Sequence, residues 1–300
     1  MSSSQEIIYK AISASFKCMG LVPRGLGLRV GGFLGRTSFL ANRKHREIAI
    51  SNLSLAYGDE KSPREIRSLA KKVFENLGKI LFEIGWFARL NRRDFDKHFR
   101  MDGLSHYDNA LKKKKGVLLL TAHVGNWELL TIFSGMTGHP VDIIYRPLDF
   151  RPMEKFFVNL RTRFGGNVIP KNRSMRRILK VLQKGEPLAF LMDQNVDWYD
   201  GVFVDFFGRR ACTNKGLALL ALKTEAPVVP IFCVREESGF RVKIGPEVPL
   251  VRTGDKTKDV EANTQQYNRV IEAIVRRYPD QWFWVHRRWK TPPYKPWPKT

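Results

Sequence analysis

Residues 117–128 read VLLLTAHVGNWE, an apolar run followed by a turn and the start of a helical pattern. Its opening run, 117–122, is largely apolar and rich in Leu, which predicts a buried strand. Gly125 and Asn126 then suit a turn, and Asn126 can cap a helix that begins at Trp127. A buried strand followed by a helix is the unit from which parallel sheets are built. The stretch therefore predicts an α/β fold.

The same alternation of strand and helix patterns continues toward the C-terminus. Further short apolar runs predict strands at 141–145, 187–192 and 227–233. Helical patterns lie near 127–136, 152–164, 174–184, 214–224 and 258–277. Ser174 and Thr213 are candidate helix caps, and Gly185 is a candidate helix stop.

A helical region precedes this alternation. Residues 62–65 (SPRE) are typical of a capped helix start, and apolar residues follow them at helical spacing. We therefore expect a helical N-terminal extension over 1–46 and a single α/β domain over 47–300. In that domain a mostly parallel central sheet is flanked by helices.

The chain is strongly basic, with 52 Lys and Arg against 29 Asp and Glu, a formal net charge of +23. This balance predicts anionic partners: nucleic acid, acidic lipid headgroups or an acidic carrier molecule. Cys18, Cys212 and Cys233 are far apart in the sequence and form no CxxC pair. This spacing excludes a disulfide scaffold and a zinc knuckle, and it fits a reducing cytoplasm.

The N-terminal segment has an amphipathic pattern without a long apolar run. Its cations break the apolar stretches well below the roughly 20 residues of a spanning helix, and no signal peptide is recognisable. Ile8, Ile12 and Met19 share one helical face, and Lys10 and Lys17 share the opposite one. Such a helix suits a membrane surface, and an ordinary helix packed on the domain is the alternative.

The C-terminal region combines aromatic rings with cations. Four of the seven tryptophans lie there among basic residues: Trp282, Trp284, Trp289 and Trp297 with Arg287, Arg288, Lys290, Lys295 and Lys299. This composition is typical of the lipid headgroup layer. A Pro-rich tail folded against the core and stacking on nucleic acid bases are the two alternatives.

Polar residues follow three of the expected strands at their carboxyl ends. His123 follows 117–122, Arg146 follows 141–145, and Asp193 and Gln194 follow 187–192. Ligands of parallel sheets bind at this edge. The sequence thus predicts that a base, a cation and an acid share one crevice.

His123 and Glu128 form a candidate catalytic pair. Glu128 falls in the first turn of the expected helix, and the turn at Gly125 could bring it back to the imidazole, which makes a general base. A structural histidine with a surface glutamate is the alternative. His123 has no second His at the spacing of a zinc site, and no G-x-S-x-G elbow supplies a serine nucleophile. The attacking group then belongs to a substrate, such as a hydroxyl that attacks an activated acyl group.

Several motifs in order resemble those of a known family. They are Asn52-Leu53, the HX4E motif from His123 to Glu128, 145–149 (YRPLD), Asp193-Gln194, 205–208 (DFFG), Thr213, 227–230 (PVVP) and 281–289 (QWFWVHRRW). The chain resembles the bacterial lipid A late acyltransferases of the lauroyl or myristoyl type, within the lysophospholipid and glycerolipid acyltransferase superfamily.

This resemblance implies an activity and a location. A fatty acyl chain would pass from an acyl thioester, of acyl carrier protein or of coenzyme A, to a hydroxyl of a lipid A precursor. No cofactor or metal is implied. The enzyme would sit at the cytoplasmic face of the inner membrane, attached peripherally or monotopically to the membrane surface.

The resemblance also implies roles for individual residues. His123 would deprotonate the acceptor hydroxyl and Glu128 would orient the imidazole. Arg146 and Lys215 would bind phosphate groups, and Asp193, beside Gln194, would shape the site by pairing with Arg146. Phe206, Phe207 and Leu217 would line an acyl pocket or belong to the core, and Thr213 would face the substrate.

Two other functions compete with this one. The first is acyl transfer to another glycolipid or to a lysophospholipid, which the same pair of residues would serve. The second is nucleic acid binding, suggested only by charge and tryptophan content. No helix-turn-helix, RRM-like or finger pattern supports it, and it leaves His123 and Glu128 unused, so we expect no nucleic acid partner.

Overall fold

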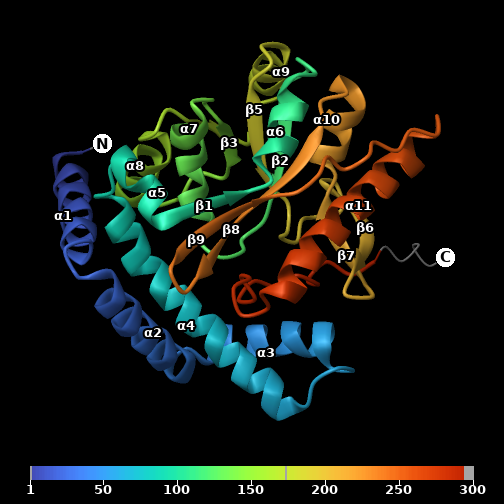
Figure 1. The fold of residues 1–300 in the computed structure, drawn as a ribbon. Helices are drawn as coiled ribbons and strands as arrows, with labels where there is room; N and C mark the ends of the chain where they lie inside the picture. The colour runs from blue at the N-terminus through green and yellow to red at the C-terminus, as the bar shows by residue number, and fades with distance from the viewer. Residues whose placement is uncertain (1, 173, 294–300) are drawn as a thin grey trace.

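A seven-stranded, mostly parallel sheet forms the centre of the computed structural model, which describes residues 2–172 and 174–293 (Figure 1). Across the sheet the strands are β1 (Phe99–Asp102), β9 (Gly239–Ile244), β8 (Val228–Glu236), β2 (Val117–Thr121), β5 (Pro187–Leu191), β3 (Asp142–Tyr145) and β4 (Asn167–Pro170). All neighbours are parallel except β8 and β9, which form an antiparallel hairpin. The prediction of an α/β fold with a mostly parallel sheet is confirmed.

Strand β2 is the central element, and every one of its residues is buried. It pairs with β5 and β8, and β5 pairs with β3. The carboxyl ends of β2, β5 and β3 therefore lie side by side, as the sequence predicted.

Helices cover both faces of the sheet, and the side chains of β2 alternate between two cores. Leu118 and Leu120 belong to one core, with α9 (Met175–Gln183), α10 (Gly216–Thr224) and α11 (Lys256–Arg277). Val117 and Leu119 belong to the other core. Its helices are α6 (Leu104–Leu111), the 3-10 helix η2 (Trp127–Thr131), α7 (Ile132–Thr137) and α8 (Arg151–Thr162), with η1 (Arg92–Asp94) and α5 (Phe95–His98) near β1.

A small hairpin of β6 (Gly201–Phe206) and β7 (Arg209–Asn214) stands apart from the main sheet. Thr213 lies in β7, so the prediction that it caps a helix is wrong. Helix α10 begins three residues after Thr213, at Gly216, and Asn214 Oδ1 accepts a hydrogen bond from the Gly216 N–H at 2.7 Å. The strand was missed because its sequence, RRACTN, is too polar to show an apolar run.

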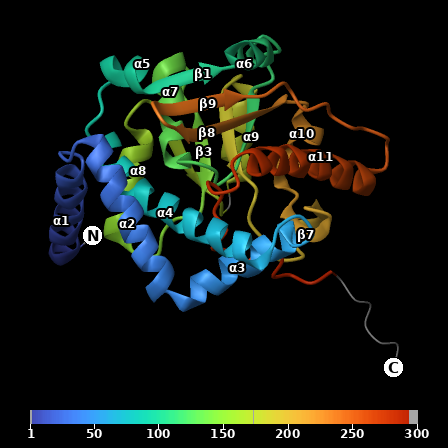
Figure 2. The same cartoon turned by 60° about the horizontal axis from the view of Figure 1, so that its bottom comes forward.

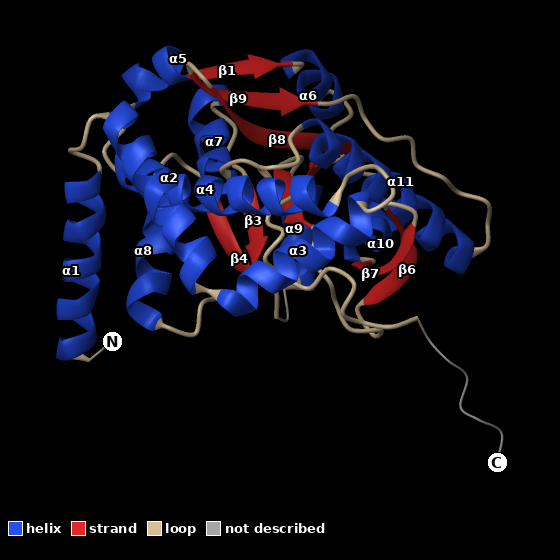
Figure 3. Cartoon of the chain, turned by 90° about the horizontal axis from the view of Figure 1, so that it is seen from below, coloured by secondary structure: helices blue, strands red, loops and turns tan. Residues whose placement is uncertain are grey.

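Four helices at the N-terminal end pack together along one side of the molecule (Figures 2 and 3). They are α1 (Ser3–Met19), α2 (Arg24–Ala41), α3 (Arg43–Tyr57) and α4 (Pro63–Phe87), and α4 contacts the other three. Helix α4 begins with the predicted capping box of Ser62 and Glu65. None of the helices in the described part of the chain is long and apolar enough to cross a bilayer.

Helices α2 and α4 approach so closely that only glycine fits between them. A Cβ atom on Gly78 would lie 2.0 Å from the Gly31 carbonyl oxygen, and one on Gly35 would lie 2.1 Å from that of Phe74. The glycines therefore set one face of α2 directly on the α4 backbone, which leaves the opposite face exposed.

We expect Gly78→Val to lower the free energy of unfolding by about 1–3 kcal/mol, because the new side chain forces the two backbones apart. Denaturant unfolding measures this loss. Gly25→Ala, near the start of the partner helix α2, is the control, since a Cβ there meets no atom within 4 Å. It should leave the free energy of unfolding unchanged or raise it. Equal stability of the two variants would contradict the proposed packing.

The C-terminal segment 281–289 is folded into the protein. Trp282, Trp284 and Arg288 are buried, whereas Trp289 is half-buried and Arg287 and Lys290 are exposed. The prediction that Trp282, Trp284 and Arg288 lie in a headgroup layer is therefore wrong, and the alternative of a tail folded on the core holds for them. Trp297, Lys295 and Lys299 lie outside the described residues.

Candidate active site

The loop after β2 is held on both sides by neighbouring backbone. Gly125 has a φ of +63°, and a Cβ there would lie 2.0 Å from the Cys233 carbonyl oxygen of β8. Its N–H donates to the Gln281 carbonyl oxygen at 2.9 Å, and the Phe283 N–H donates to the His123 carbonyl oxygen at 3.0 Å. The backbone at His123 is thus fixed between β8 and the C-terminal segment.

His123 and Asp193 come together at the carboxyl edge of the sheet. In the register of β2 and β5, Thr121 lies opposite Leu191, so residues 123 and 193 follow at matching positions. The His123 Nδ1 atom lies 2.8 Å from Asp193 Oδ1, and the His123 backbone N–H donates to Oδ2 at 3.0 Å. The Trp282 Nε1–H also donates to Oδ2, at 2.7 Å.

The surroundings of Asp193 keep its buried carboxylate charged. Burial opposes ionisation, but the charge and hydrogen bond of His123 and the Trp282 N–H outweigh burial and hold the pKa of Asp193 below its usual range. An ionised carboxylate only accepts hydrogen bonds, so the proton of the neutral imidazole lies on Nδ1. Nε2 then carries a free lone pair, and the arrangement is that of a general base held by a carboxylate.

Two aromatic rings flank the imidazole. Trp127 packs edge-on against it at 4.9 Å between ring centroids, and Phe283 lies at 5.9 Å. The side chain of His123 remains 19% exposed. The ring is thus confined and still accessible to a substrate.

Glu128 does not orient the imidazole, which corrects the prediction. It lies in the first turn of η2 as expected, but its carboxylate forms a double hydrogen bond with Arg161 of α8, at 2.7 and 2.8 Å. The Nδ1 position of His123 is taken by Asp193. Burial disfavours the charge of Arg161, but Glu128 outweighs this effect and raises the pKa of Arg161.

We expect Glu128→Gln to lower the free energy of unfolding by about 3 kcal/mol, because it removes the carboxylate that pairs directly with the largely buried Arg161. Denaturant unfolding measures the loss. Asp149→Asn, which removes the carboxylate from an exposed pair with Arg146, is the matched control and should leave stability unchanged. If Glu128→Gln is as stable as the control, the ion pair does not hold α8 to η2.

Arg146 and Asp193 do not pair, contrary to the prediction. Arg146 contacts Asp149 at 3.4 Å, and both side chains are mostly exposed. Asp193 instead points inward behind His123, where its oxygen atoms accept hydrogen bonds from the imidazole, the His123 backbone N–H and the Trp282 indole N–H. Gln194 follows it and is half-buried, as is Lys215 at the start of α10.

The remaining predicted substrate contacts belong to the core. Phe206 and Thr213 have no exposed surface, and Phe207 and Leu217 are buried beside them. Arg288 donates to Thr213 Oγ1 at 2.5 Å, and its guanidinium lies 5.0 Å from the centre of the Phe206 ring. These residues thus support the C-terminal segment that bears Trp282 and do not form a solvent-facing wall.

A buried polar network behind the loop escaped the sequence-based prediction. Asn126 does not cap a helix with its side chain but donates to Glu83 of α4 at 2.9 Å. Glu83 also pairs with Arg235 of β8 through both carboxylate oxygens. Glu83 is a charged residue between Ile80 and Ile84 on the apolar face of α4, and this position was the sequence feature that could have indicated the network. Within the described residues no three His, Cys, Asp or Glu side chains could hold a metal ion together.

Comparison with known proteins agrees with this geometry. The family model for bacterial lipid A biosynthesis acyltransferases matches residues 3–291. A lipid A biosynthesis palmitoleoyltransferase of Escherichia coli is 30% identical over 89% of this chain and 85% of its own length. A lipid A biosynthesis lauroyltransferase of the same organism is 28% identical over 88% of this chain and 85% of its own.

A more distant relative has a different acceptor in its name. A phosphatidylinositol mannoside acyltransferase of Mycolicibacterium smegmatis is 26% identical over 62% of this chain and 60% of its own length. All three relatives are named as acyltransferases, and the arrangement of His123 and Asp193 is that of a general base held by a carboxylate. The chain is therefore an acyltransferase that belongs to the bacterial lipid A biosynthesis acyltransferase family.

Proposed function

We propose that the protein transfers a fatty acyl chain from an acyl thioester to a hydroxyl of a lipid A precursor, with acyl carrier protein as the preferred donor. The observation that carries this proposal is the contact of 2.8 Å between His123 Nδ1 and the buried carboxylate of Asp193. The names of the relatives support the acceptor class, and the net charge of +23 suits an acidic carrier and an anionic glycolipid.

In the proposed reaction His123 acts first as a base and then as an acid. Nε2 takes the proton of the acceptor hydroxyl while its oxygen attacks the thioester carbonyl carbon, which forms a tetrahedral intermediate. The C–S bond then breaks, an ester remains on the acceptor, and the thiolate recovers the proton from Nε2 as a thiol. Asp193 stabilises the imidazolium between the two steps.

Other residues near this edge support substrate binding in the proposal. Arg146 and Lys215 contact phosphate groups of donor or acceptor, and Gln194 lies beside Asp193 at the same strand end. Glu128 contributes by holding Arg161 in place, and not by contact with the imidazole.

We further propose that the protein lies on an anionic membrane surface, which in the bacterial cell is the cytoplasmic face of the inner membrane. Helix α2 and the turn before it expose a stripe of large apolar side chains, which we call the α2 stripe: Leu21, Leu26, Val30, Phe33, Leu34 and Leu40. Exposed Arg29 and Arg36 lie on the same helix. An apolar face with cations beside it suits insertion into the boundary of headgroups and acyl chains.

We expect Phe33→Ser to weaken binding to vesicles of phosphatidylglycerol and phosphatidylcholine about tenfold or more. Phe33 is 64% exposed, and burial of a Phe side chain contributes about 1.5–3 kcal/mol. Co-sedimentation measures the binding, and raised salt should release the protein. Met175→Ser removes a similarly exposed side chain from α9 and should bind like the wild type. If the two variants bind the vesicles equally well, the α2 stripe does not contact the membrane.

The activity is tested by incubating the purified protein with acyl carrier protein thioesters and a set of defined acceptors. Mass spectrometry of the products should show one added acyl chain on a lipid A precursor. A phosphatidylinositol mannoside and a lysophospholipid are the comparison acceptors, because one relative is named for the former. If only a comparison acceptor is acylated, the substrate is that acceptor and not a lipid A precursor.

A further inference from the structure

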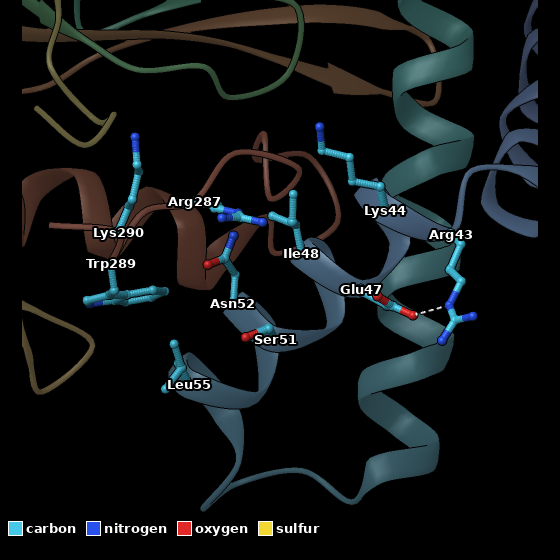
Figure 4. Close-up of a pocket in the computed structure, with 10 residues that line it drawn as sticks. All are labelled: Arg43, Lys44, Glu47, Ile48, Ser51, Asn52, Leu55, Arg287, Trp289 and Lys290. Atoms are coloured by element: carbon cyan, nitrogen blue, oxygen red, sulfur yellow. Dashed lines mark hydrogen bonds and ion pairs between the residues drawn. The ribbon is translucent and has the colours of Figure 1, made fainter.

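A basic hollow lies between α3 and the C-terminal segment, and none of the proposed reaction steps uses it. We call it the α3 pocket (Figure 4). Its volume is about 650 Å³, which is in the range of pockets for small ligands. It is lined by Arg43, Lys44, Glu47, Ile48, Ser51, Asn52, Leu55, Arg287, Trp289 and Lys290.

The pocket carries uncompensated positive charge. Arg43 is paired with Glu47 at 2.6 Å. In the described part of the chain, Lys44, Arg287 and Lys290 form no ion pair with a carboxylate. Figure 4 shows the side chains of Lys44 and Lys290 extending in the same direction on either side of the hollow, with Arg287 between them. Three cations without a carboxylate partner along one hollow suit a phosphate-bearing ligand.

Apolar side chains complete the lining. Ile48 and Leu55 of α3 and the indole of Trp289 are half-buried there. A site for a simple anion needs no such surface. The combination of cations with an aromatic and two aliphatic side chains fits a ligand that joins phosphate to a less polar body.

The pocket and the catalytic imidazole share one backbone segment. Phe283 donates its N–H to the His123 carbonyl oxygen, and Arg287 follows four residues later. Four residues span at most about 14 Å of chain. Asn52 of α3 donates to the carbonyl oxygens of Trp284 and His286, at 2.7 and 2.5 Å, and so fixes this segment against the pocket. A ligand in the α3 pocket is therefore held at a fixed distance from the imidazole of His123.

The pocket also adjoins the α2 stripe. Leu40, which is 69% exposed, lies near the end of α2, and Arg43 begins α3. A lipid whose chains remain in the membrane beside Leu40 would bring its headgroup to the cations of the pocket. This position distinguishes a membrane lipid from a carrier protein, which would need a broad outer surface in place of a concave pocket.

We infer that the α3 pocket binds the phosphate-bearing sugar headgroup of the acceptor glycolipid and thereby sets which hydroxyl reaches His123. The inference rests on the proposed function for the identity of the acceptor. Lys44, Arg287 and Lys290 hold the phosphate, and Trp289 packs on the sugar.

A binding experiment tests this without the reaction. Wild-type protein is titrated calorimetrically with glucosamine 1-phosphate, inorganic phosphate and glucosamine. The sugar phosphate should bind most tightly, and a triple variant (Lys44→Ala, Arg287→Ala, Lys290→Ala) should lose at least tenfold in affinity. The control triple variant (Lys112→Ala, Lys114→Ala, Lys223→Ala) removes the same charge at the amino edge of the sheet, where these side chains are exposed, and should bind normally.

Two titration results would overturn the inference. Equal affinity for glucosamine and its phosphate would exclude a role of the cations, and equal affinity for inorganic phosphate and the sugar phosphate would leave a simple anion site. The inference also fails if the two triple variants bind the sugar phosphate equally.

Steady-state kinetics then show whether the pocket binds the acceptor or the acyl donor. In the pocket variant the KM for the lipid A precursor should rise at least tenfold, with kcat and the donor KM within twofold of the wild type. A rise in the donor KM alone would assign the pocket to the acyl carrier and overturn the inference. If the wild type transfers no acyl chain, the proposed function fails, while the titrations still decide whether the pocket takes a phosphorylated sugar.

Discussion

Replacement of Asp193 by asparagine is expected to lower kcat about 10⁴-fold, as the loss of the carboxylate behind a catalytic histidine does in serine proteases. The side chain keeps its size, and an oxygen in the Oδ2 position can still accept from Trp282 and from the His123 backbone N–H. We therefore expect the variant to stay folded, with its thermal unfolding midpoint close to that of the wild type.

The expected loss follows from the tautomer of His123. With the amide oxygen facing Trp282 and the backbone N–H, the amide nitrogen faces Nδ1. An amide NH₂ group donates, so Nδ1 must become the acceptor and the imidazole proton moves to Nε2. Nε2 then has no lone pair for the acceptor hydroxyl, and the base is lost although the geometry remains.

Initial rates of acyl transfer measure this effect. Asp197→Asn, a change of the same type at an exposed position in the following loop, should retain normal turnover. A folded Asp193→Asn variant with wild-type turnover would show that the carboxylate does not position His123.

Replacement of His123 by alanine is expected to lower kcat/KM by about 10²- to 10⁴-fold, the range for a lost general base. The ring is partly exposed, and the backbone N–H at position 123 still donates to Asp193, so the fold should persist. Circular dichroism checks this point alongside the kinetic assay.

His139→Ala provides the matched control. His139 is exposed and lies before β3, at the amino edge of the sheet, so its loss should not change turnover. If a folded His123→Ala variant turns over as fast as the control, the proton transfer does not pass through this imidazole.

Most of the elements around the site could be predicted from the sequence, because their patterns are local. The strands β2, β3, β5 and β8 appear as short apolar runs, and the buried β2 is the clearest of them. Strands β1 (FRMD) and β7 (RRACTN) could not be found in this way. Their polar residues carry no apolar run, and their pairing is set by contacts distant in the sequence.

The partner of His123 was mispredicted for a similar reason. Spacing along the chain placed Glu128 near the imidazole, but Arg161, from a helix 33 residues later, takes its carboxylate. Asp193 was correctly expected at the same edge of the sheet. Its pairing with His123 depends on the register of β2 with β5, which no local pattern contains.

The C-terminal tryptophans show the limit of composition as a guide. Trp282 and Trp284 suggested a headgroup layer, yet both are buried, and the Trp282 N–H hydrogen bonds to Asp193. An indole suits a membrane interface and a polar site in the core equally well, because both offer an apolar contact with one hydrogen-bond acceptor. Only the fold decides between them.

Nitrogen NMR of the histidine side chains observes which ring nitrogen of His123 carries the proton, and the proposed role of Asp193 depends on that position. The six histidines are labelled, and the His123 signals are assigned by their loss in His123→Ala. That role predicts an imidazole whose neutral form is protonated on Nδ1 in the wild type and on Nε2 in Asp193→Asn. A wild-type ring protonated on Nε2, or the same tautomer in both proteins, would contradict it.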